Sequence, residues 1–275
     1  MITPLIKWAG GKRQLRSELL GRLPDRWGTY FEPFIGGGAL LVELANLQKL
    51  SGAVIGDKNP ELVNLYAVVK KDPGALLEEL SDEKFRNDED SFNHLKEEFN
   101  TLIGTKKHAV ERAALLIYLN KHSYNGLWRV NRKGKYNVPF GRHAKLSLPS
   151  AMSMMKFSQM LQGVRIRHAD FARIVQNAGK GDFVYFDPPY HPLSKTANFT
   201  DYTTGGFTFK DQERLARVFK KLSDKGVLLM LSNSKSPEVE ELYRDYPVYT
   251  VNAKRFINCN GQKRSGAFEI IVTNY

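Results

Sequence analysis

The stretch from Phe183 to Tyr190 constrains this chain more than any other, because an apolar run stops abruptly at an acid, two prolines and an aromatic ring. Residues 183–186 are apolar throughout, which is typical of a short strand buried on both faces of a parallel sheet. Proline lacks an N–H group and biases the preceding residue towards extended backbone, so the strand must end there. In open α/β sheets, ligands bind beyond the carboxyl ends of the strands.

The residues that end this strand are suited to holding a planar ring that bears an amino group. Asp187 supplies a carboxylate, and Pro188 and Pro189 supply carbonyl groups that no local helix occupies. Tyr190 adds a flat ring. Two acceptors can take the N–H bonds of an amine while an aromatic face stacks on the ring that carries it. We therefore expect a catalytic site of Asp187, Pro188 and Tyr190 at the rim of the sheet.

A second unit of strand, glycine turn and helix lies near the start of the chain. Residues 30–34 read as a strand, three glycines stand at 36–38, and residues 39–47 form an apolar helical stretch. The next strand, residues 53–57, ends at Asp57, nineteen positions after Gly38. An acid at about this spacing binds ribose hydroxyl groups, and glycines let the backbone approach a ligand. The spacing alone fits NAD, FAD or S-adenosylmethionine.

The remaining pattern predicts an α/β fold with one helical interruption. Strand patterns return at residues 164–170, 183–186, 227–233, 248–253 and 268–273, and residues 210–222 form an amphipathic helix. From about residue 60 to residue 119 the apolar period is helical instead. We expect a Rossmann-like sheet in a catalytic domain of residues 1–59 and 146–275, interrupted by a helical insert of residues 60–145.

Positive charge is concentrated between Lys121 and Lys145, a segment with seven Lys or Arg and no Asp or Glu, in a chain whose net charge is +12. Alternation around a turn at residues 133–134 predicts a β-hairpin over residues 128–138. Aromatic rings lie among the cations, at Tyr124, Trp128, Tyr136 and Phe140. Cations that neutralise phosphate, rings that stack and donors that reach base edges are typical of an element that reads DNA.

In their order along the chain, these motifs resemble those of the Dam-type DNA adenine-N6 methyltransferases, which include the modification enzymes of GATC-specific restriction systems. The resemblance covers nearly the whole chain. It rests on Lys-Trp-Ala-Gly-Gly-Lys at 7–12, Phe-Ile-Gly-Gly-Gly at 34–38 with Asp57, Tyr-Asn-Gly-Leu at 124–127, Asn-Val-Pro-Phe-Gly-Arg at 137–142, Asp-Pro-Pro-Tyr at 187–190 and Thr-Ala-Asn-Phe-Thr at 196–200. The insert departs from the family at residues 121–123 and at Trp128.

The resemblance implies an enzyme that uses S-adenosylmethionine, releases S-adenosylhomocysteine, needs no metal and methylates the adenine of GATC in double-stranded DNA. The target base would be flipped out of the duplex, stack on Tyr190 and donate its amine N–H bonds to Asp187 and the Pro188 carbonyl. By matching positions, Asp57 would take the ribose hydroxyls, and Asp170 with Phe171 the adenine end of the cofactor. The implied cofactor pocket comprises Trp8, Gly10, Lys12, Phe34, Gly36, Gly38, Asp57, Asp170, Phe171 and Asp187.

The resemblance also implies a set of DNA contacts in the insert and at the start of the chain. Tyr124 would wedge into the base stack, Leu127 would meet a thymine methyl and Arg129 would read a guanine edge. The full set is Lys7, Tyr124, Asn125, Leu127, Arg129, Pro139 and Arg142.

The residues leave three other interpretations open. A cytosine-N4 methyltransferase could use the same tetrapeptide at 187–190. An NAD-dependent oxidoreductase would explain the glycine turn and Asp57, but neither the basic segment nor the Asp-Pro-Pro-Tyr motif. A cofactor-free DNA-binding module would leave both strand-end acids without a role. Cytosine-C5 methylation needs a thiolate beside a proline, whereas Cys259 stands between two asparagines.

The single cysteine and the first residues of the chain indicate the cellular compartment in which we expect the protein. Cys259 is the single cysteine, so the sequence allows no disulfide framework and no Cys-based zinc site. Residues 1–4 begin no signal peptide, and no apolar run is long enough to cross a membrane. We expect a cytoplasmic monomer, from a bacterium or a phage, that is associated with the nucleoid and not with a membrane.

Overall fold

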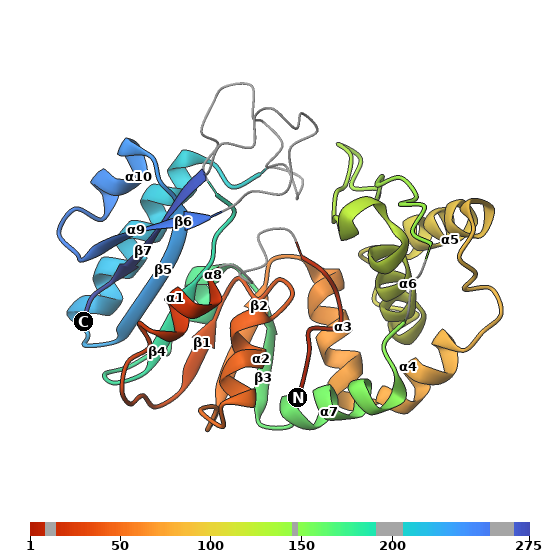
Figure 1. Ribbon diagram of the computed structural model, residues 1–275, viewed down its shortest axis with the longest axis horizontal. Helices are drawn as coiled ribbons and strands as arrows, with labels where there is room; N and C mark the ends of the chain where they lie inside the picture. The colour runs from red at the N-terminus through yellow and green to blue at the C-terminus, as the bar shows by residue number, and fades with distance from the viewer. Residues whose placement is uncertain (9–14, 145–147, 191–205, 254–266) are drawn as a thin grey trace.

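The computed structural model describes residues 1–8, 15–144, 148–190, 206–253 and 267–275 (Figure 1). Within these ranges the strands form a sheet in the order β3-β2-β1-β4-β5-β7-β6. Neighbouring strands from β3 to β5 are parallel, while β7 runs antiparallel to both β5 and β6. The strands are β1 (Tyr30–Glu32), β2 (Ala53–Asp57), β3 (Val164–His168), β4 (Phe183–Phe186), β5 (Leu228–Ser234), β6 (Val248–Ala253) and β7 (Ala267–Thr273).

The sheet is buried on both faces, as the apolar run at 183–186 predicts. Along β4, Phe183 and Tyr185 point into one core, and Val184 and Phe186 point into the other. The first face is covered by α1 (Arg16–Leu20), α2 (Ala39–Asn46), α3 (Pro60–Lys71) and α7 (Ala151–Leu161). The second face is covered by α8 (Phe171–Ile174), α9 (Phe209–Asp224) and α10 (Pro237–Leu242). The mixed α/β architecture with a Rossmann-like sheet is therefore confirmed.

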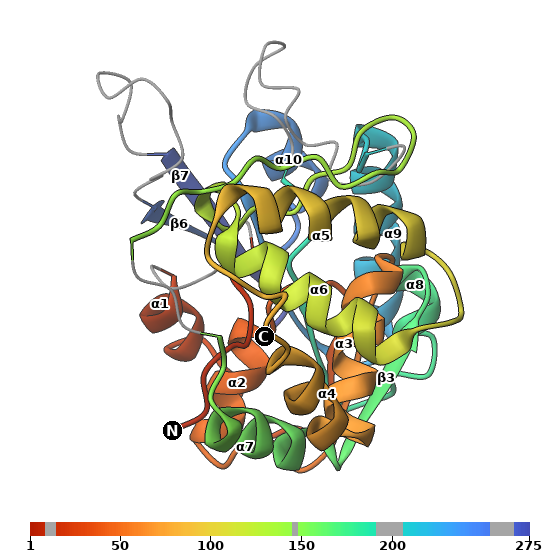
Figure 2. The same ribbon diagram turned by 90° about the vertical axis from the view of Figure 1, so that its right-hand side faces the viewer.

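The helical block expected after residue 60 consists of α3, α4 (Pro73–Leu80), α5 (Glu89–Leu102) and α6 (Ala109–His122). In α5, Phe92, Leu95 and Phe99 form one buried stripe, which is the pattern of a helix with one covered face. Helix α6 is instead buried along most of its length, because it packs between α3 and α5 (Figure 2). The apolar residues of α6 join the same core as one face of the sheet.

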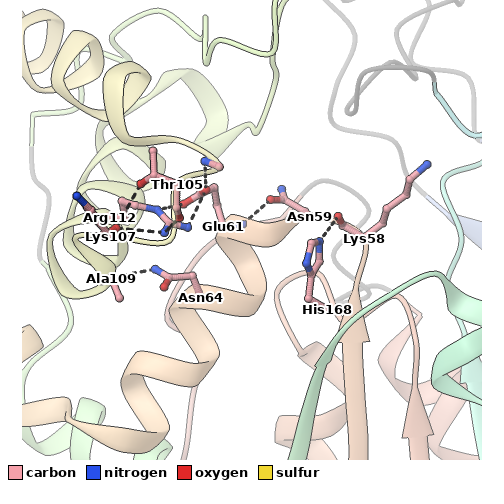
Figure 3. Close-up of polar contacts among 10 residues, drawn as sticks. Lys58, Asn59, Glu61, Asn64, Thr105, Lys107, Ala109, Arg112 and His168 are labelled. Atoms are coloured by element: carbon pink, nitrogen blue, oxygen red, sulfur yellow. Dashed lines mark hydrogen bonds and ion pairs between the residues drawn. The ribbon is translucent and has the colours of Figure 1, made fainter.

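A buried ion pair joins the first and last helices of this block (Figure 3). Arg112 of α6 donates from Nε and Nη2 to the two carboxylate oxygens of Glu61 on α3, at 3.0 and 2.9 Å. Gly104 donates its backbone N–H to Glu61 Oε1 at 2.8 Å, and Arg112 Nη1 donates to the Thr105 carbonyl. Because both charges have several partners away from water, loss of either one would leave the other charge buried and uncompensated.

The segment after α6 contains a hairpin that is shorter than expected. A short 3-10 helix, η1 (Tyr124–Gly126), comes first, and the hairpin narrows to a single bridge between Val130 and Tyr136. Asn131 builds the turn, since its side-chain Oδ1 accepts from the N–H groups of Lys133 and Lys135 at 2.9 and 3.1 Å. The Asn131 N–H donates to the Lys135 carbonyl at 2.8 Å and the Asn137 N–H donates to the Arg129 carbonyl at 3.1 Å, so the chain reverses as an antiparallel hairpin where predicted. The pairing is short, because side chains such as Asn131 and Asn100 take N–H groups that a longer ladder would use.

In the described part of the chain, no helix is both long enough and apolar enough to cross a membrane.

Candidate active site and DNA interface

Asp187 lies at the carboxyl end of β4, where the order of the sheet reverses. Strand β1 pairs with β2 on one side and with β4 on the other, and a crevice at such a switch point is the usual ligand site of this architecture. Ser232 of β5 donates from Oγ to Asp187 Oδ1 at 3.0 Å, and the Tyr185 hydroxyl lies 2.8 Å from the same Oγ. Side chains of two adjacent strands therefore orient the carboxylate.

The turn that follows Asp187 is held by a chain of buried amides. Gln212 of α9 donates from Nε2 to the Pro189 carbonyl at 3.0 Å. Asn233 of β5 donates from Nδ2 to Gln212 Oε1, also at 3.0 Å. Both amide side chains are fully buried, so breaking either bond would leave a buried polar group without a hydrogen-bond partner. These two amides, on α9 and β5, fix the backbone of the Asp-Pro-Pro-Tyr motif.

Tyr190 is fixed by its hydroxyl and keeps part of its surface exposed. The hydroxyl donates to Glu269 Oε2 of β7 at 2.6 Å. Burial, followed by the negative charges of Asp187 and Glu269, raises the pKa of Tyr190 well above its ordinary value. The phenol therefore stays neutral, and the ring keeps one orientation at the edge of the site.

Glu32 is a further acid at this edge, beyond those that the sequence motifs indicate. It ends β1, is 3% exposed, and accepts a hydrogen bond from the Tyr30 hydroxyl at 2.9 Å. Burial raises the pKa of Glu32 to about 8, with a further upward contribution from the charge of Asp187. Glu32 stands directly before Pro33, just as Asp187 stands before Pro188. That shared acid–proline step after a buried strand is the signal that could have found it.

The glycine turn after β1 meets the acid at the end of β2, as predicted from their spacing. Gly36 and Gly38 have φ angles of +47° and +68°, a region that side chains disfavour. Gly36 donates its N–H to Asp57 Oδ2 at 3.3 Å, and Asn59 donates its N–H to Oδ1 at 2.9 Å. Tyr66 of α3 donates to the Gly36 carbonyl at 3.0 Å. Burial raises the pKa of Asp57 to about 6, against the opposing effect of the backbone N–H groups.

Trp8 lies directly against this turn. A Cβ atom on Gly36 would stand 2.7 Å from Trp8 Cδ1, and one on Gly37 would stand 3.2 Å from Trp8 Cβ. Those glycines are therefore needed where the turn touches the indole. Two other predicted pocket residues, Gly10 and Lys12, lie outside the described residues.

Asp170 and Phe171 stand at the start of α8, after the edge strand β3. Asp170 caps this helix, and both of its carboxylate oxygens accept from Arg214 of α9, at 2.8 and 2.7 Å. Hydrogen bonds from Arg214 hold the pKa of Asp170 below its ordinary value. Arg214 also lies over the Phe171 ring at 4.2 Å, and Phe34 stacks on that ring at 5.3 Å. Nothing local in the sequence identifies Arg214, which lies 44 positions from Asp170.

These residues fit the methyl donor that the motifs imply. The half-buried Asp57 carboxyl lies at the glycine turn, and the half-buried Phe34 ring, stacked on Phe171, adds an aromatic face. Such a set suits a ligand with a ribose and a purine. In the described ranges, no group of three or more His, Cys, Asp or Glu side chains could hold a metal ion.

The predicted DNA contacts lie on the segment after α6 and on the N-terminal segment beside it. Tyr124 is 48% exposed, and its backbone N–H is fixed by the Pro139 carbonyl at 3.0 Å. Asn125 and Pro139 are exposed and Leu127 is half-buried. The side chain of Lys7 is exposed, and its charge lowers the pKa of the neighbouring Lys121, after the larger effect of burial. Positive charge is therefore concentrated at this junction.

Two arginines of this surface already have protein partners. Arg129 donates from Nε to Asn137 Oδ1 at 2.8 Å and from Nη2 to the Asn137 carbonyl at 2.9 Å. These bonds hold the guanidinium as a rigid fork with further N–H groups left over. Arg142 forms an exposed ion pair with Glu89 of α5 at 3.1 Å, a contact of the kind that contributes little to stability.

Three of the four aromatic residues expected to stack on DNA do not face outwards. Trp128 and Tyr136 are buried and pack on Phe99 of α5, and Phe140 is half-buried against Phe92. The backbone alternates here, so Trp128 and Tyr136 point inwards while their polar neighbours point outwards. Interpreting these rings as stacking partners for bases was wrong, and Tyr124 is the exposed ring of the four.

Comparison with known proteins decides the class of enzyme. Residues 8–257 match the family described as D12 class N6 adenine-specific DNA methyltransferase. This chain belongs to that family. It is 43% identical to a type II methyltransferase of Lactococcus lactis subsp. cremoris over 276 residues, covering 100% of this chain and 96% of the relative. It is 40% identical to a type II methyltransferase of Methanocaldococcus jannaschii over 288 residues, covering 100% of this chain and 99% of the relative.

A third relative carries the name that the motif order suggests. The methyltransferase is 35% identical to a DNA adenine methylase of Serratia marcescens over 271 residues, covering 97% of this chain and 96% of the relative. The prediction of an adenine-specific DNA methyltransferase is thus confirmed, and the cytosine-N4, oxidoreductase and cofactor-free interpretations are set aside. The family implies S-adenosylmethionine as the methyl donor and DNA as the substrate.

Proposed function

We propose that the methyltransferase flips an adenine out of double-stranded DNA, within the sequence GATC, and methylates its N6 amine between Asp187 and the glycine turn. The observation that carries this proposal is the fixed carboxylate of Asp187 at the switch point of the sheet, with the turn of Gly36 and Gly38 on the neighbouring strand end. S-adenosylmethionine, when bound there, supplies an electrophilic methyl group.

The protein's own task is to orient the amine. Asp187 Oδ and the Pro188 carbonyl accept its two N–H bonds, which directs the nitrogen lone pair away from them and towards the donor. Ser232 keeps Asp187 in place, and the bond from Gln212 to Pro189 keeps the carbonyls of the turn in place. Tyr190, fixed by Glu269, offers a ring for the base to stack on. Orientation of this kind supplies much of a rate enhancement without a strong base.

Charge placement supports the same step. The amine nitrogen would become cationic as the new N–C bond forms and the bond between the methyl group and the donor's sulfur breaks, and only afterwards would it lose one proton to water. Asp187 is the carboxylate in direct reach of that cation, so it stabilises charge where charge develops. Glu32, whose pKa is raised to about 8, is protonated at neutral pH and does not compete for the cation.

Different cofactor-pocket residues bind the ribose and the adenine of the nucleoside. Asp57 accepts the ribose hydroxyls, because its carboxyl lies at the turn. Asp170 and Phe171 receive the adenine, and Arg214 holds Asp170 by two bonds so that its carboxylate keeps one orientation. Trp8 supports the turn from the side of the N-terminal segment.

Recognition of GATC is assigned to the insert of residues 60–145, and catalysis to residues 1–59 and 146–275, with the chain acting as a monomer. Tyr124 is the exposed ring that can enter the space left by the flipped base. Arg129 presents a preformed fork, which suits the O6 and N7 acceptors of guanine. Lys7 and Arg142 contact phosphates, Asn125 and Pro139 line the groove, and Leu127 meets a thymine methyl.

The test compares Asp187→Asn with the wild-type protein on a labelled duplex that contains one GATC site. We expect the variant to lose methyl transfer by at least about a hundredfold while its affinity for the duplex changes less than threefold. A duplex with GTTC in place of GATC serves as the matched substrate control. Normal turnover by the variant, or equal methylation of both duplexes, would contradict the proposal.

A further inference from the structure

Asn120 of α6 joins two segments that are distant in the sequence. The Lys7 N–H donates to Asn120 Oδ1 at 2.8 Å, and Asn120 Nδ2 donates to the Lys7 carbonyl at 2.7 Å. Nδ2 also donates to the Gly126 carbonyl at 3.0 Å. The side chain is 2% exposed, so the amide has no water to replace these partners. One buried amide therefore fixes the N-terminal segment and η1 relative to each other.

The two segments lead to different parts of the enzyme. Lys7 precedes Trp8, whose indole lies against the turn of Gly36 and Gly37. Gly126 belongs to η1, the element that carries the exposed Tyr124. In Figure 1 the first residues, drawn in red, run between the sheet and the helical block towards the end where the parallel strands terminate.

The contact between the segments is tight as well as polar. Gly126 has a φ angle of +64°, and a Cβ atom there would lie 2.8 Å from Lys7 Cβ, so the backbone of Gly126 packs directly against the Lys7 side chain. Beyond this point Trp8 stacks on Trp128 at 6.0 Å, and Trp128 packs on Tyr136 at 5.5 Å. The DNA-recognition loop is the segment of residues 124–142 that follows α6. A displacement of the glycine turn that moves Trp8 must therefore also move this loop or break the bonds of Asn120.

We propose that Asn120 is a positioning residue that couples the cofactor pocket to the DNA-recognition loop, so that each ligand strengthens the binding of the other. The inference rests on the proposed function, because it takes the glycine turn as the cofactor site and the Tyr124 loop as the DNA site. Coupling of this kind is reciprocal, and the same factor must appear whichever ligand is added first.

The chain offers two matched controls, since two other asparagines make the same pair of bonds to a backbone residue. Asn46 of α2 accepts from the Ile2 N–H at 2.8 Å and donates to the Ile2 carbonyl at 2.9 Å, so it fixes the N-terminal segment alone. Asn100 of α5 accepts from the Tyr136 N–H at 2.7 Å and donates to the Tyr136 carbonyl at 3.1 Å, so it fixes the recognition loop alone.

The experiment measures the Kd of S-adenosylhomocysteine by calorimetry, with and without a saturating GATC duplex, for the wild type and for Asn46→Ser, Asn100→Ser and Asn120→Ser. We expect the duplex to tighten wild-type binding by roughly 5- to 150-fold, the usual range of coupling. The two control variants should keep that factor to within about twofold, whereas Asn120→Ser should bring it close to one. The duplex Kd, measured with and without S-adenosylhomocysteine, should change by the same factor in each protein.

A second variant covers the case in which Asn120→Ser does not fold. Gly126→Ala leaves the Asn120 side chain in place but puts a Cβ atom against Lys7 Cβ, so Lys7 must move and the coupling factor should also fall. The inference is overturned if Asn120→Ser and Gly126→Ala keep the wild-type factor, if both controls lose it as well, or if wild-type protein that binds both ligands shows no coupling. Failure of the proposed function would look different, because the wild type would then not bind S-adenosylhomocysteine or would not methylate adenine.

Discussion

Replacement of Glu32 by glutamine should change how the stability of the protein depends on pH. The buried carboxyl has its pKa raised from 4.5 to about 8. A folded-state pKa above the unfolded value means that the folded protein holds the proton more tightly than the unfolded chain. The stabilising contribution is therefore complete below about pH 4.5 and is lost as the pH rises through about 8.

The size of the effect follows from the shift. Each pKa unit corresponds to 1.36 kcal/mol, so the full loss is about 5 kcal/mol, of which about 4 kcal/mol falls between pH 5 and pH 9. Glutamine has the same shape, can still accept from the Tyr30 hydroxyl and does not ionise. The free energy of unfolding of Glu32→Gln, relative to the wild type, should therefore rise across this interval.

Urea denaturation at a series of pH values measures the difference between the two proteins. Two further variants, Asp187→Asn and Asp57→Asn, test whether nearby charge and burial cause the raised pKa values. Asp187→Asn removes one charge that raises the pKa of Glu32, so the transition should move to lower pH. Asp57→Asn tests a second acid, which is half-buried and whose pKa is raised from 3.8 to about 6. This change should alter stability by about 3 kcal/mol in a lower window, between about pH 4 and pH 6. A difference curve for Glu32→Gln that stays flat from pH 5 to pH 9 would refute the reasoning.

Three further predictions follow from contacts of the fold and the site. Gln212→Leu removes the donor to the Pro189 carbonyl and should lower kcat by roughly ten- to a hundredfold while KM for DNA stays within twofold, as single-turnover and steady-state assays will show. Arg112→Met leaves Glu61 buried without its cation and should cost about 3–5 kcal/mol in urea denaturation, most of which the double change with Glu61→Leu should restore. Arg129→Lys keeps the charge but loses the fork, so discrimination against one altered base pair should fall by about 1–3 kcal/mol while binding to unrelated DNA at low salt stays within twofold.

Much of the fold was predictable because its signals are local. The apolar run at 183–186, closed by Asp187 and two prolines, specifies both a buried strand and the place where it stops. The glycine turn and Asp57 specify the first strand pair by their spacing alone. In each case a few neighbouring residues leave the backbone little choice, and the structure has the expected elements at these positions.

The residues that sequence reasoning missed act over long distances. Arg214, Gln212 and Asn120 lie in helices whose apolar pattern says only which face is buried. Their partners are 44, 23 and 113 positions away, and no local spacing identifies them. The error at Trp128 and Tyr136 has a related cause, since an aromatic residue between cations has the same local pattern whether its ring faces a base or Phe99.

The carboxylates of Asp187 and Glu269 form a negative corner inside a protein whose net charge is +12. A polyanion is attracted to most of this surface but repelled at that corner, whereas an uncharged heterocycle meets no such barrier. The electrostatic field of the enzyme therefore favours an orientation in which the sugar-phosphate chain stays outside the site and the nucleobase enters it. Free adenine nucleotides, which carry their phosphates with them, should for this reason be poor methyl acceptors even at millimolar concentration.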